Sequence, residues 1–521
     1  MGLLLPPAIA GNRPADPDQP SRQLAAIRQS QASGEPTTST TPTQLIALLK
    51  QLQQQIRSKA QPLSLTQAID LGLRNSPQLL TTFETIRQYE WQLIAAKRQW
   101  NPTVQLSNGT PFVGYQWQSF VQNYSTGIQP DLLQVSQRSS LNTRALINQP
   151  GATISWNVID PMRQPNINAA ADSLRQQKYL FAVSARNLIL DIQQAYYGIQ
   201  SSQQLIDSFE QIYAINQQQL TILEALKKIG MVTVLDLAQT RSQLFIQLSQ
   251  LVTYTQAYID QTARLSELLA LPQDTLAIPA DAAGLQGRWS LSLEETVARA
   301  RRQREEILAS LAAAEASSWA AVTALRSYLP VFSLVGNGSF TSLDGSESGN
   351  GLLGSGSPSL QSRQWTLATG IGFSWSLFDG GIQDANAKAA RAQAQQQKAQ
   401  AVQTELQVVQ QVRSSYALLQ TSMVALESAR QAYRSAELAQ EAARARFSVG
   451  VGDITSVVQA IQQLSQAAEQ TSQAMFAYNT SLAQLYRYSA TWPGDSEAEL
   501  NKRLRVMPPT SSSLQGSLSA P

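Results

Sequence analysis

Apolar residues recur at three-residue and four-residue spacing over long stretches that contain almost no glycine or proline. Such spacing is typical of helices that pack together as coiled coils. The stretches that end at Gly230 and Gly450 each predict a helix of about 100 Å, at about 1.5 Å per residue. The same rise predicts return helices of about 60 Å at 232–270 and 452–490, and opening helices of about 50 Å at 66–100 and 294–328.

Four shorter segments alternate apolar residues with small or polar ones, which predicts β-strands at 103–121, 151–160, 331–340 and 365–379. An apolar face opposite a small, polar face is typical of a membrane barrel, whose strands need about 9 to 11 residues to cross a bilayer. The residues predicted to face lipid are Ile154, Trp156, Val158, Leu367, Ile371, Phe373, Trp375 and Leu377. The strands of soluble β-sandwiches also alternate apolar and polar residues, but such folds contain more than the four strands predicted here.

Closure of the barrel then depends on more than one chain. Four strands cannot close on themselves in lipid, because the two open edges would leave backbone groups unsatisfied. Three chains would supply twelve strands, enough to enclose a water-filled interior. The fold class expected is therefore mixed α and membrane β, with long coiled-coil hairpins and four transmembrane strands per chain.

The chain contains an internal duplication. The segment LSLTQAIDLGLRNSPQLL begins at Leu63, and the similar LSLEETVARARRQREEIL begins at Leu291. Each opens with a capping box, formed by Ser64 with Gln67 and by Ser292 with Glu295, which predicts a helix start. Later the strand GATISWNVIDP matches GIGFSWSLFDG, and the turn at Gly230 matches that at Gly450. We therefore expect repeats at 63–271 and 291–491, joined by a linker at 272–290.

The chain ends have a different composition. Residues 1–10, MGLLLPPAIA, resemble the remnant of a signal peptide, although the basic start of such a peptide is missing. Residues 11–62 are expected to be a disordered extension with one possible short helix at 43–56, and residues 492–521 a flexible tail. No run of about 18 uninterrupted apolar residues occurs, so no transmembrane helix is expected.

Composition excludes several classes of protein. The chain has no cysteine and no histidine, which removes disulfide frameworks, zinc sites of the Cys/His type and serine–histidine triads. With Lys+Arg 39 against Asp+Glu 36, the charge is close to balance, so a nucleic-acid partner is not expected. No nucleophile motif is found, and we expect no enzymatic activity, no cofactor and no bound metal.

Four features of the sequence together resemble the TolC family of outer-membrane factors. They are the duplicated LSLxxAI start, the step from helix through proline to strand, the SW(N/S)(V/L)(I/F)D strand end, and the glycine turns followed by long Gln/Ala-rich helices. The resemblance covers residues 63–491. It implies a homotrimer in the outer membrane of a diderm bacterium, with a shared 12-stranded barrel that continues as a periplasmic α-helical tunnel. It also implies an exit duct for tripartite efflux or type I secretion. The implied partners are a periplasmic adaptor, also called a membrane fusion protein, and an inner-membrane transporter of the ABC or proton-driven type.

The same resemblance implies a gate at the periplasmic entrance. Asp236 matches the family's aspartate after the first glycine turn, but its usual partners, a tyrosine and an arginine, are replaced by Phe447 and Gly452. Ser456 and Gln459 stand where the family has acidic residues, and Asp453 is nearby. An alternative for Asp236 and Asp453 is a plain helix-start aspartate, which the helix dipole favours.

The two glycine turns also resemble the hairpin tips that contact adaptors in the family. The candidate contact residues are Gly230, Met231, Gly450 and Val451. An alternative function is a coiled-coil scaffold or periplasmic structural protein that forms no channel. The apolar face of residues 365–377 argues against the scaffold, because such a face would aggregate if it were left in water.

Overall fold

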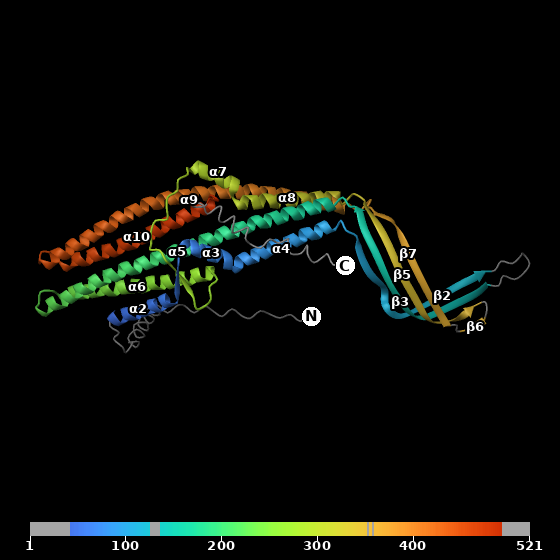
Figure 1. Cartoon of the computed structure of the whole chain (residues 1–521), viewed down its shortest axis with the longest axis horizontal. Coiled ribbons are helices and arrows are strands. Elements are labelled where there is room, and N and C mark those ends of the chain that lie inside the picture. Colours follow the sequence, from blue (N-terminus) through green and yellow to red (C-terminus); the bar gives the residue numbers. More distant parts are fainter. Residues whose placement is uncertain (1–41, 126–135, 352–353, 357–358, 492–521) are drawn as a thin grey trace, which may run out of the picture. The chain divides into compact units, whose positions relative to one another are not determined.

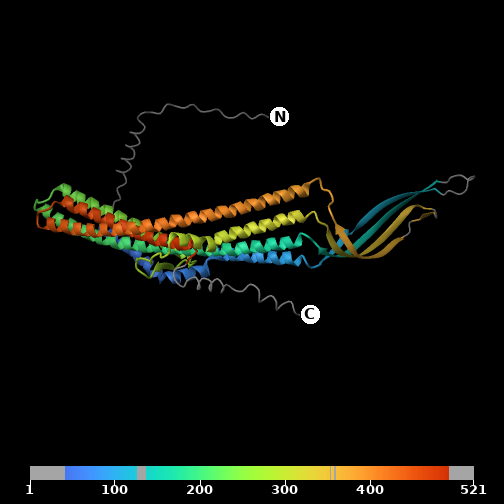
Figure 2. The ribbon, with the colours of Figure 1, turned by 90° about the horizontal axis from the view of Figure 1, so that it is seen from above.

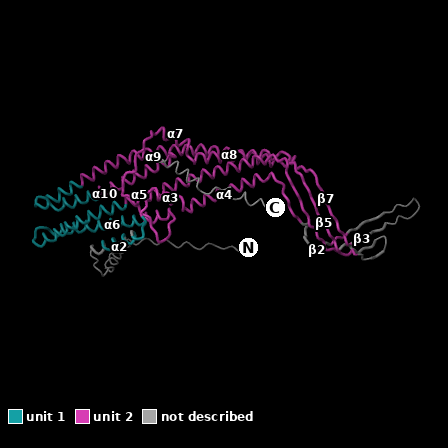
Figure 3. The backbone as a smooth tube through the Cα atoms, in the orientation of Figure 1, with its two compact units in different colours: residues 1–61, 202–259, 437–465 teal, residues 62–201, 260–436, 466–521 magenta. Residues whose placement is uncertain are grey.

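The computed structural model describes residues 42–125, 136–351, 354–356 and 359–491. These residues divide into two compact units, one containing residues up to 61, 202–259 and 437–465, and the other containing 62–201, 260–436 and the residues from 466 onward (Figure 3). We call them unit 1 and unit 2. Each unit draws on both halves of the duplication, so neither repeat is a compact body by itself.

Two long helices and two return helices carry most of the structure. They are α5 (Arg163–Lys228), α6 (Val234–Leu268), α9 (Ile382–Ser448) and α10 (Ile454–Tyr488) (Figures 1 and 2). These bounds confirm the helices expected from the apolar spacing. Gly230 and Gly450 close the two hairpins with φ angles of 77° and 78°, a left-handed conformation that favours glycine. At the first turn Met231 N donates to Leu226 O at 3.0 Å, and at the second Val451 N donates to Arg446 O at 3.0 Å, so both helices end in the same motif.

Each opening helix is divided in two, which the sequence pattern did not predict. The pieces are α3 (Leu65–Asn75) with α4 (Pro77–Arg98), and α7 (Leu293–Gln303) with α8 (Glu305–Arg326). In the first half Pro77 begins a new helix because it has no N–H to donate, and the Ser76 side chain caps it. In the second half Arg304 is extended, at φ −73° and ψ 123°, with no side-chain cap. Both predicted capping boxes are present.

One described segment, Leu293–Arg326, is long and apolar enough to cross a membrane by length and composition, because it contains an 18-residue window with a mean hydropathy of 1.3. This differs from the expectation of no such helix. The alanine-rich sequence of α8 accounts for the hydropathy, and buried alanines such as Ala312 and Ala321 show that part of it packs against neighbours.

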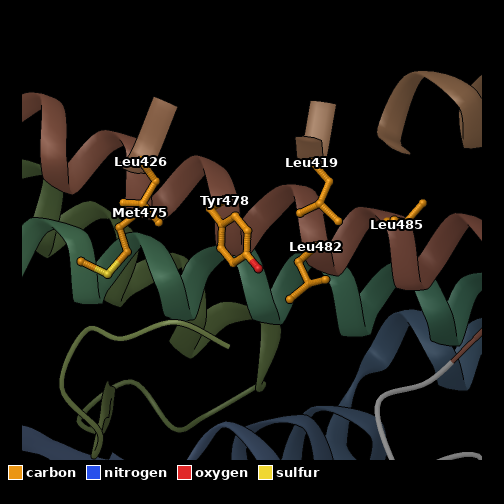
Figure 4. Close-up of a cluster of buried hydrophobic side chains, with 6 residues drawn as sticks. All are labelled: Leu419, Leu426, Met475, Tyr478, Leu482 and Leu485. Atoms are coloured by element: carbon orange, nitrogen blue, oxygen red, sulfur yellow. The ribbon is translucent and has the colours of Figure 1, made fainter. Parts of the chain in front are cut away.

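Unit 2 contains an apolar core between α9 and α10. Figure 4 shows it as a layer of side chains from the two helices: Leu419, Leu426, Met475, Tyr478, Leu482 and Leu485. The seam also contains small polar residues, because the Ser422 and Ser481 hydroxyls lie 3.0 Å apart and hydrogen-bond across it. The linker is tied to this core, since Tyr478 donates its hydroxyl to Gly287 O at 2.7 Å.

The sheet of unit 2 is much longer than predicted. Its antiparallel strands are β2 (Thr103–Ser125), β3 (Ser136–Ile159), β5 (Val331–Gly351), the short β6 (Gly354–Gly356) and β7 (Ser359–Ser374). Residues 136–148 and 341–351 lie outside the predicted strands but continue the ladder, because Ser, Asn, Thr and Gly residues pair as well as apolar ones once neighbouring strands are in register. Where β5 pairs with β3, a Cβ at Gly345 would overlap the Arg144 carbonyl oxygen, so this position requires glycine.

The predicted end of the last strand is also corrected. β7 stops at Ser374, so Trp375 and Leu377 lie beyond the strand rather than within it. The chain must turn there into α9, and Gly380 and Gly381 make the turn at φ angles of 72° and 89°. Asp379 then caps α9 by accepting from Gln383 N at 2.8 Å.

The segment before the first repeat contains a helix where a short one was considered at 43–56. Helix α2 (Pro42–Lys59) is longer than the short helix predicted, and it packs in unit 1 through Ile46 and Leu49 against Tyr213, Leu244 and Leu248. The strand β1 (Ala60–Leu63) then pairs with β4 (Leu276–Pro279), which lies in the expected linker. The signal-peptide remnant, the rest of the extension to residue 41 and the tail from 492 lie outside the described residues.

Candidate functional site

The predicted lipid-facing side chains of the strands lie on one face of the sheet. Ile371 is paired with Leu334, which is paired with Trp156, and Phe373 is paired with Phe332. Paired residues in neighbouring strands point to the same side, so these form continuous apolar rows. The rows are open to the surroundings in the single chain: Ile371 is 79% exposed and Leu367 is 84% exposed. Ile154 and Val158, also predicted, are exposed on β3.

The opposite face of the same strands is small and polar. Ser333 is paired with Gly372, and Asn337 with both Ala368 and Thr153. Glycine and alanine leave free space next to the backbone, and the serine, threonine and asparagine side chains hydrogen-bond with water. One wall therefore has an apolar side suited to lipid and a polar side suited to a water-filled interior.

Tryptophans fix the step from helix to strand in both halves. Trp156 donates its indole N–H to Trp100 O at 2.8 Å, and Trp375 donates to Tyr328 O at 2.9 Å. The duplication aligns Trp156 with Trp375 and Trp100 with Tyr328, so the same contact is made twice. Arg163 adds to the first junction, with its guanidinium 4.1 Å from the Trp100 ring centre. Indole rings at such a boundary are typical of membrane interfaces.

The two candidate entrance aspartates take part in the N-terminal caps of helices in unit 1. Asp236 accepts from Thr233 N at 2.8 Å and Thr233 Oγ1 at 2.7 Å, while Asp236 N donates to Thr233 Oγ1 at 3.2 Å. Asp453 accepts from Ser456 N at 3.2 Å and from its hydroxyl. The Ser456 hydrogen bonds lower the pKa of Asp453 from its ordinary value, since they favour the charged form. The helix-start alternative is therefore present in the structure, and both carboxylates remain beside the glycine turns.

The other candidate gate residues do not form a latch within the chain. Phe447 is half-buried in the last turn of α9, Gln459 is exposed on α10, and Gly452 lies in the turn, where an added Cβ would sit 3.2 Å from Phe447 N. Ser456 is bound to Asp453 as described above. Among the residues that the structure describes, none of these makes a hydrogen bond to Asp236.

The hairpin tips are more apolar than the sequence analysis noted. Met231 and Val451, the predicted contact residues, are 70% and 72% exposed. They are accompanied by further exposed apolar side chains that the analysis missed, namely Ile229, Val234, Leu235 and Val449. Apolar residues on both sides of a glycine turn were the available signal. Exposed apolar clusters of this kind are typical of protein–protein contacts.

Unit 2 also contains a buried charge cluster that the sequence analysis missed. Glu306 accepts from Arg304 Nε at 3.0 Å and from Arg487 Nη2 at 2.5 Å, and Arg487 Nε donates to Asn187 Oδ1 at 2.9 Å. Burial raises the pKa of Glu306, but the Arg487 and Arg304 guanidiniums outweigh it and lower that pKa to about 2. The cluster joins the break at Arg304 to α5 and to the end of α10. No group of acidic side chains suited to a metal ion occurs among the described residues.

Comparisons with known proteins identify similar chains. A family model described as "Outer membrane efflux protein" matches residues 68–271 and 296–491. The solved Campylobacter jejuni CmeC outer membrane channel is 17% identical, covers 84% of this chain and 88% of its own, and has a TM-score of 0.63.

Two further solved structures are about equally similar. The outer membrane protein VceC from Vibrio cholerae is 16% identical, with coverage of 82% and 96% and a TM-score of 0.62. The open state of the Neisseria gonorrhoeae MtrE outer membrane channel is 17% identical, with coverage of 82% and 89% and a TM-score of 0.61. At such identities the likeness shows the fold. A search of curated proteins found no match.

Proposed function

The chain belongs to the outer membrane efflux protein family, and from this premise we propose that three copies form a passive exit duct through the outer membrane of a diderm bacterium. Proteins of this family are transport channels rather than enzymes. Each copy contributes four strands to a twelve-stranded barrel, and the long helices form a periplasmic tunnel. Small molecules or proteins pass through this duct in efflux, type I secretion or both.

The two faces of the sheet carry this proposal. The rows of Ile371, Leu334 and Trp156 are suited to lipid, while the rows of Ser333, Asn337 and Thr153 are suited to water. A sheet with free edges β2 and β7 is not stable in a bilayer, because the backbone groups at its edges lack partners there. Neighbouring copies remove these edges by pairing β7 of one chain with β2 of the next.

The mass of the protein extracted from membranes, corrected for detergent, tests this proposal. We expect a trimer that resists dissociation, because closure of the sheet requires it. A monomer would contradict the shared barrel. Release of the protein into the aqueous phase by an alkaline carbonate wash would also contradict it, and would favour the coiled-coil scaffold instead.

The partners of this duct are a periplasmic adaptor and an inner-membrane transporter, of the ABC or proton-driven type, that supplies the energy. The exposed apolar residues at the two hairpin tips support contact with an adaptor there. A photoreactive residue at Met231 or Val451 is expected to trap an adaptor in cells, whereas one at the exposed Glu441 of α9 serves as the matched control. Failure to trap at both tips would count against this contact.

Threefold symmetry turns Asp236 and Asp453 into rings of three carboxylates near the tunnel entrance, which select cations. We expect Asp236→Asn and Asp453→Asn each to lower the cation-to-anion permeability ratio at least about twofold, as measured by reversal potentials in planar bilayers. Asparagine caps helices about as well as aspartate at position 453, and Thr233 still caps α6 when position 236 is changed, so the turns are expected to stay folded. Asp207→Asn, on the exposed surface of α5, is the control.

The pH dependence of this selectivity gives a second readout. The lowered pKa of Asp453 keeps its carboxylate charged to a lower pH than an ordinary aspartate. Selectivity is therefore expected to persist through neutral and mildly acidic pH and to fall only below about pH 4, the ordinary aspartate range. Selectivity that is unchanged in both variants at neutral pH would leave the aspartates as helix caps alone.

A further inference from the structure

Charge is distributed unevenly along the strands of unit 2. Residues 103–125, 145–159, 331–343 and 364–374 contain no Asp, Glu, Lys or Arg. The first charged residues beyond these segments are Arg144 on β3, Asp344 on β5 and Arg363 on β7. On β3, β5 and β7 the half nearest the helices is therefore free of charge, and the distal half is not.

Aromatic side chains mark both ends of this uncharged half. Trp156 and Trp375 bind carbonyl oxygens at the helix junctions, and Trp365 packs on its partner Phe340 with ring centres 4.6 Å apart. Trp365 and Trp375 lie ten positions apart in the sequence, which matches the about 9 to 11 residues that cross a bilayer. Aromatic girdles at both interfaces are typical of membrane barrels. The bilayer therefore covers this half of the sheet.

The strands continue well beyond this band. β2 and β3 remain paired from Val113 opposite Asn148 out to Ser125 opposite Ser136. A bulge between Asn108 and Val113 inserts extra residues into β2 and changes its alternation. Because of this change, Tyr115 and Trp117 lie on the same face as Val104 and Leu106, with Leu146 and Arg144 as their partners.

We propose that the distal half of the sheet stands outside the cell, and that Trp117, Tyr115 and Arg144 bind the phosphorylated sugar headgroup of an outer-leaflet glycolipid. This rests on the proposed outer-membrane channel. Trp117 is 74% exposed and Tyr115 is 86% exposed, so both rings are open to a sugar. The Arg144 guanidinium lies 5.8 Å from the centre of the Trp117 ring. It forms no ion pair with any described side chain, which leaves it available for a phosphate.

The height of this patch favours a glycolipid over a phospholipid. Arg144 is paired with Ser346, six positions beyond Phe340 at the edge of the band. Six residues span about 20 Å along a strand, and a tilt of about 45° places the patch about 14 Å above the hydrocarbon. The headgroup layer of a phospholipid bilayer is only about 5 to 8 Å thick on each side. A sugar headgroup extends further and reaches the patch.

Binding of purified lipopolysaccharide to the detergent-solubilised protein tests the patch. We expect Arg144→Gln and Trp117→Ser each to weaken binding about tenfold, the effect of one lost charged or stacking contact of about 1.4 kcal/mol. Trp117→Tyr is expected to restore most of the affinity. Arg413→Gln, which removes the same charge from the exposed surface of α9, is expected to bind as the wild type does.

Three outcomes would overturn the headgroup site. One is equal binding by Arg144→Gln and Arg413→Gln. Another is undiminished binding of dephosphorylated lipopolysaccharide, since the phosphate is then not recognised. A third is equally tight binding of phosphatidylglycerol vesicles, because the occupant would then be a phospholipid.

Labelling with a membrane-impermeant maleimide tests which half is outside, and the absence of cysteine from the chain makes each introduced thiol unique. On intact cells we expect Ser119→Cys to react and Ile371→Cys not to react. Gln459→Cys, in the periplasm under the proposed function, is expected to react only after the outer membrane is permeabilised. If Ser119→Cys does not react on intact cells while the other two variants behave as expected, the distal half is not outside the cell, but the proposed channel is not contradicted. If Gln459→Cys reacts on intact cells, or carbonate releases the protein, the channel itself fails.

Discussion

Replacing Ile371 with arginine is expected to abolish assembly of the protein in the outer membrane. Ile371 lies on the apolar face, is 79% exposed and is paired with Leu334. An arginine near the bilayer midplane costs about 2 to 4 kcal/mol in a membrane barrel, and a trimer carries three of them, for a total of about 6 to 12 kcal/mol. That total is comparable to the whole stability of a typical folded domain. The measurement is the amount of dissociation-resistant trimer in outer-membrane fractions.

The matched control is Ala368→Arg, only three positions away on the same strand. Ala368 is paired with Asn337 on the polar face, so its arginine enters the water-filled interior. We expect this variant to assemble normally and to lower single-channel conductance for cations. If both variants assemble equally well, the two faces of the sheet have been assigned wrongly, and the proposed wall of the duct loses its main support.

Replacing Glu306 with glutamine is expected to destabilise the helical part of unit 2 by about 3 kcal/mol. Breaking a buried ion pair typically costs about 3 to 5 kcal/mol, because the remaining charge is left without a partner. Here two arginines are left, with Arg304 and Arg487 only 3% and 5% exposed. The loss of helical circular dichroism during denaturant unfolding measures the effect. Glu315→Gln breaks a pair with Arg175 in which both side chains are at least half exposed, and about 0.5 kcal/mol or less is expected there.

The pH dependence follows from the pKa of Glu306, which is lowered from its ordinary value to about 2 in the folded protein. A carboxyl with a lowered folded pKa stabilises the fold above its unfolded pKa, about 4.3 for glutamate, and this contribution is lost as the pH falls toward the folded value. The wild type is therefore expected to lose stability between about pH 5 and pH 2, and Glu306→Gln to lose less over the same window. Parallel curves for the two proteins would show that Glu306 is not coupled to the arginines.

Helix starts and hairpin turns were predictable because short-range chemistry decides them. Ser64 and Ser292 cap helices through residues three positions later, so the sequence shows both partners of each contact. Gly230 and Gly450 end helices because glycine adopts positive φ without strain. The break at Pro77 could have been recognised from its missing N–H. The matching break at Arg304 could not, since no local residue requires it and a distant ion cluster accompanies it.

The features of the candidate site also fall into those that the sequence predicted and those that depended on the tertiary structure. The apolar face through Ile154, Ile371 and Phe373 follows from strict alternation, and the register of the strands places these residues on one face. The length of the strands was missed because β3 and β5 continue through Ser, Asn and Gly residues, whose pairing depends on the neighbouring strand and not on their own preference. The capping roles of Asp236 and Asp453 were recognised as an alternative, and the structure shows the hydrogen bonds.

The sequence by itself determined the long helices, their caps and turns, the duplication and the two chemically different faces of the strands. Each of these depends on residues within a few positions of one another, or on a period that a single strand or helix imposes. Only the tertiary structure decided how far the sheet extends, that Glu306 meets Arg487 from the end of another helix, and that the bulge in β2 returns Trp117 to the apolar face beside Arg144. These features join residues far apart in the chain, and their energies come from burial and pairing that no single segment contains.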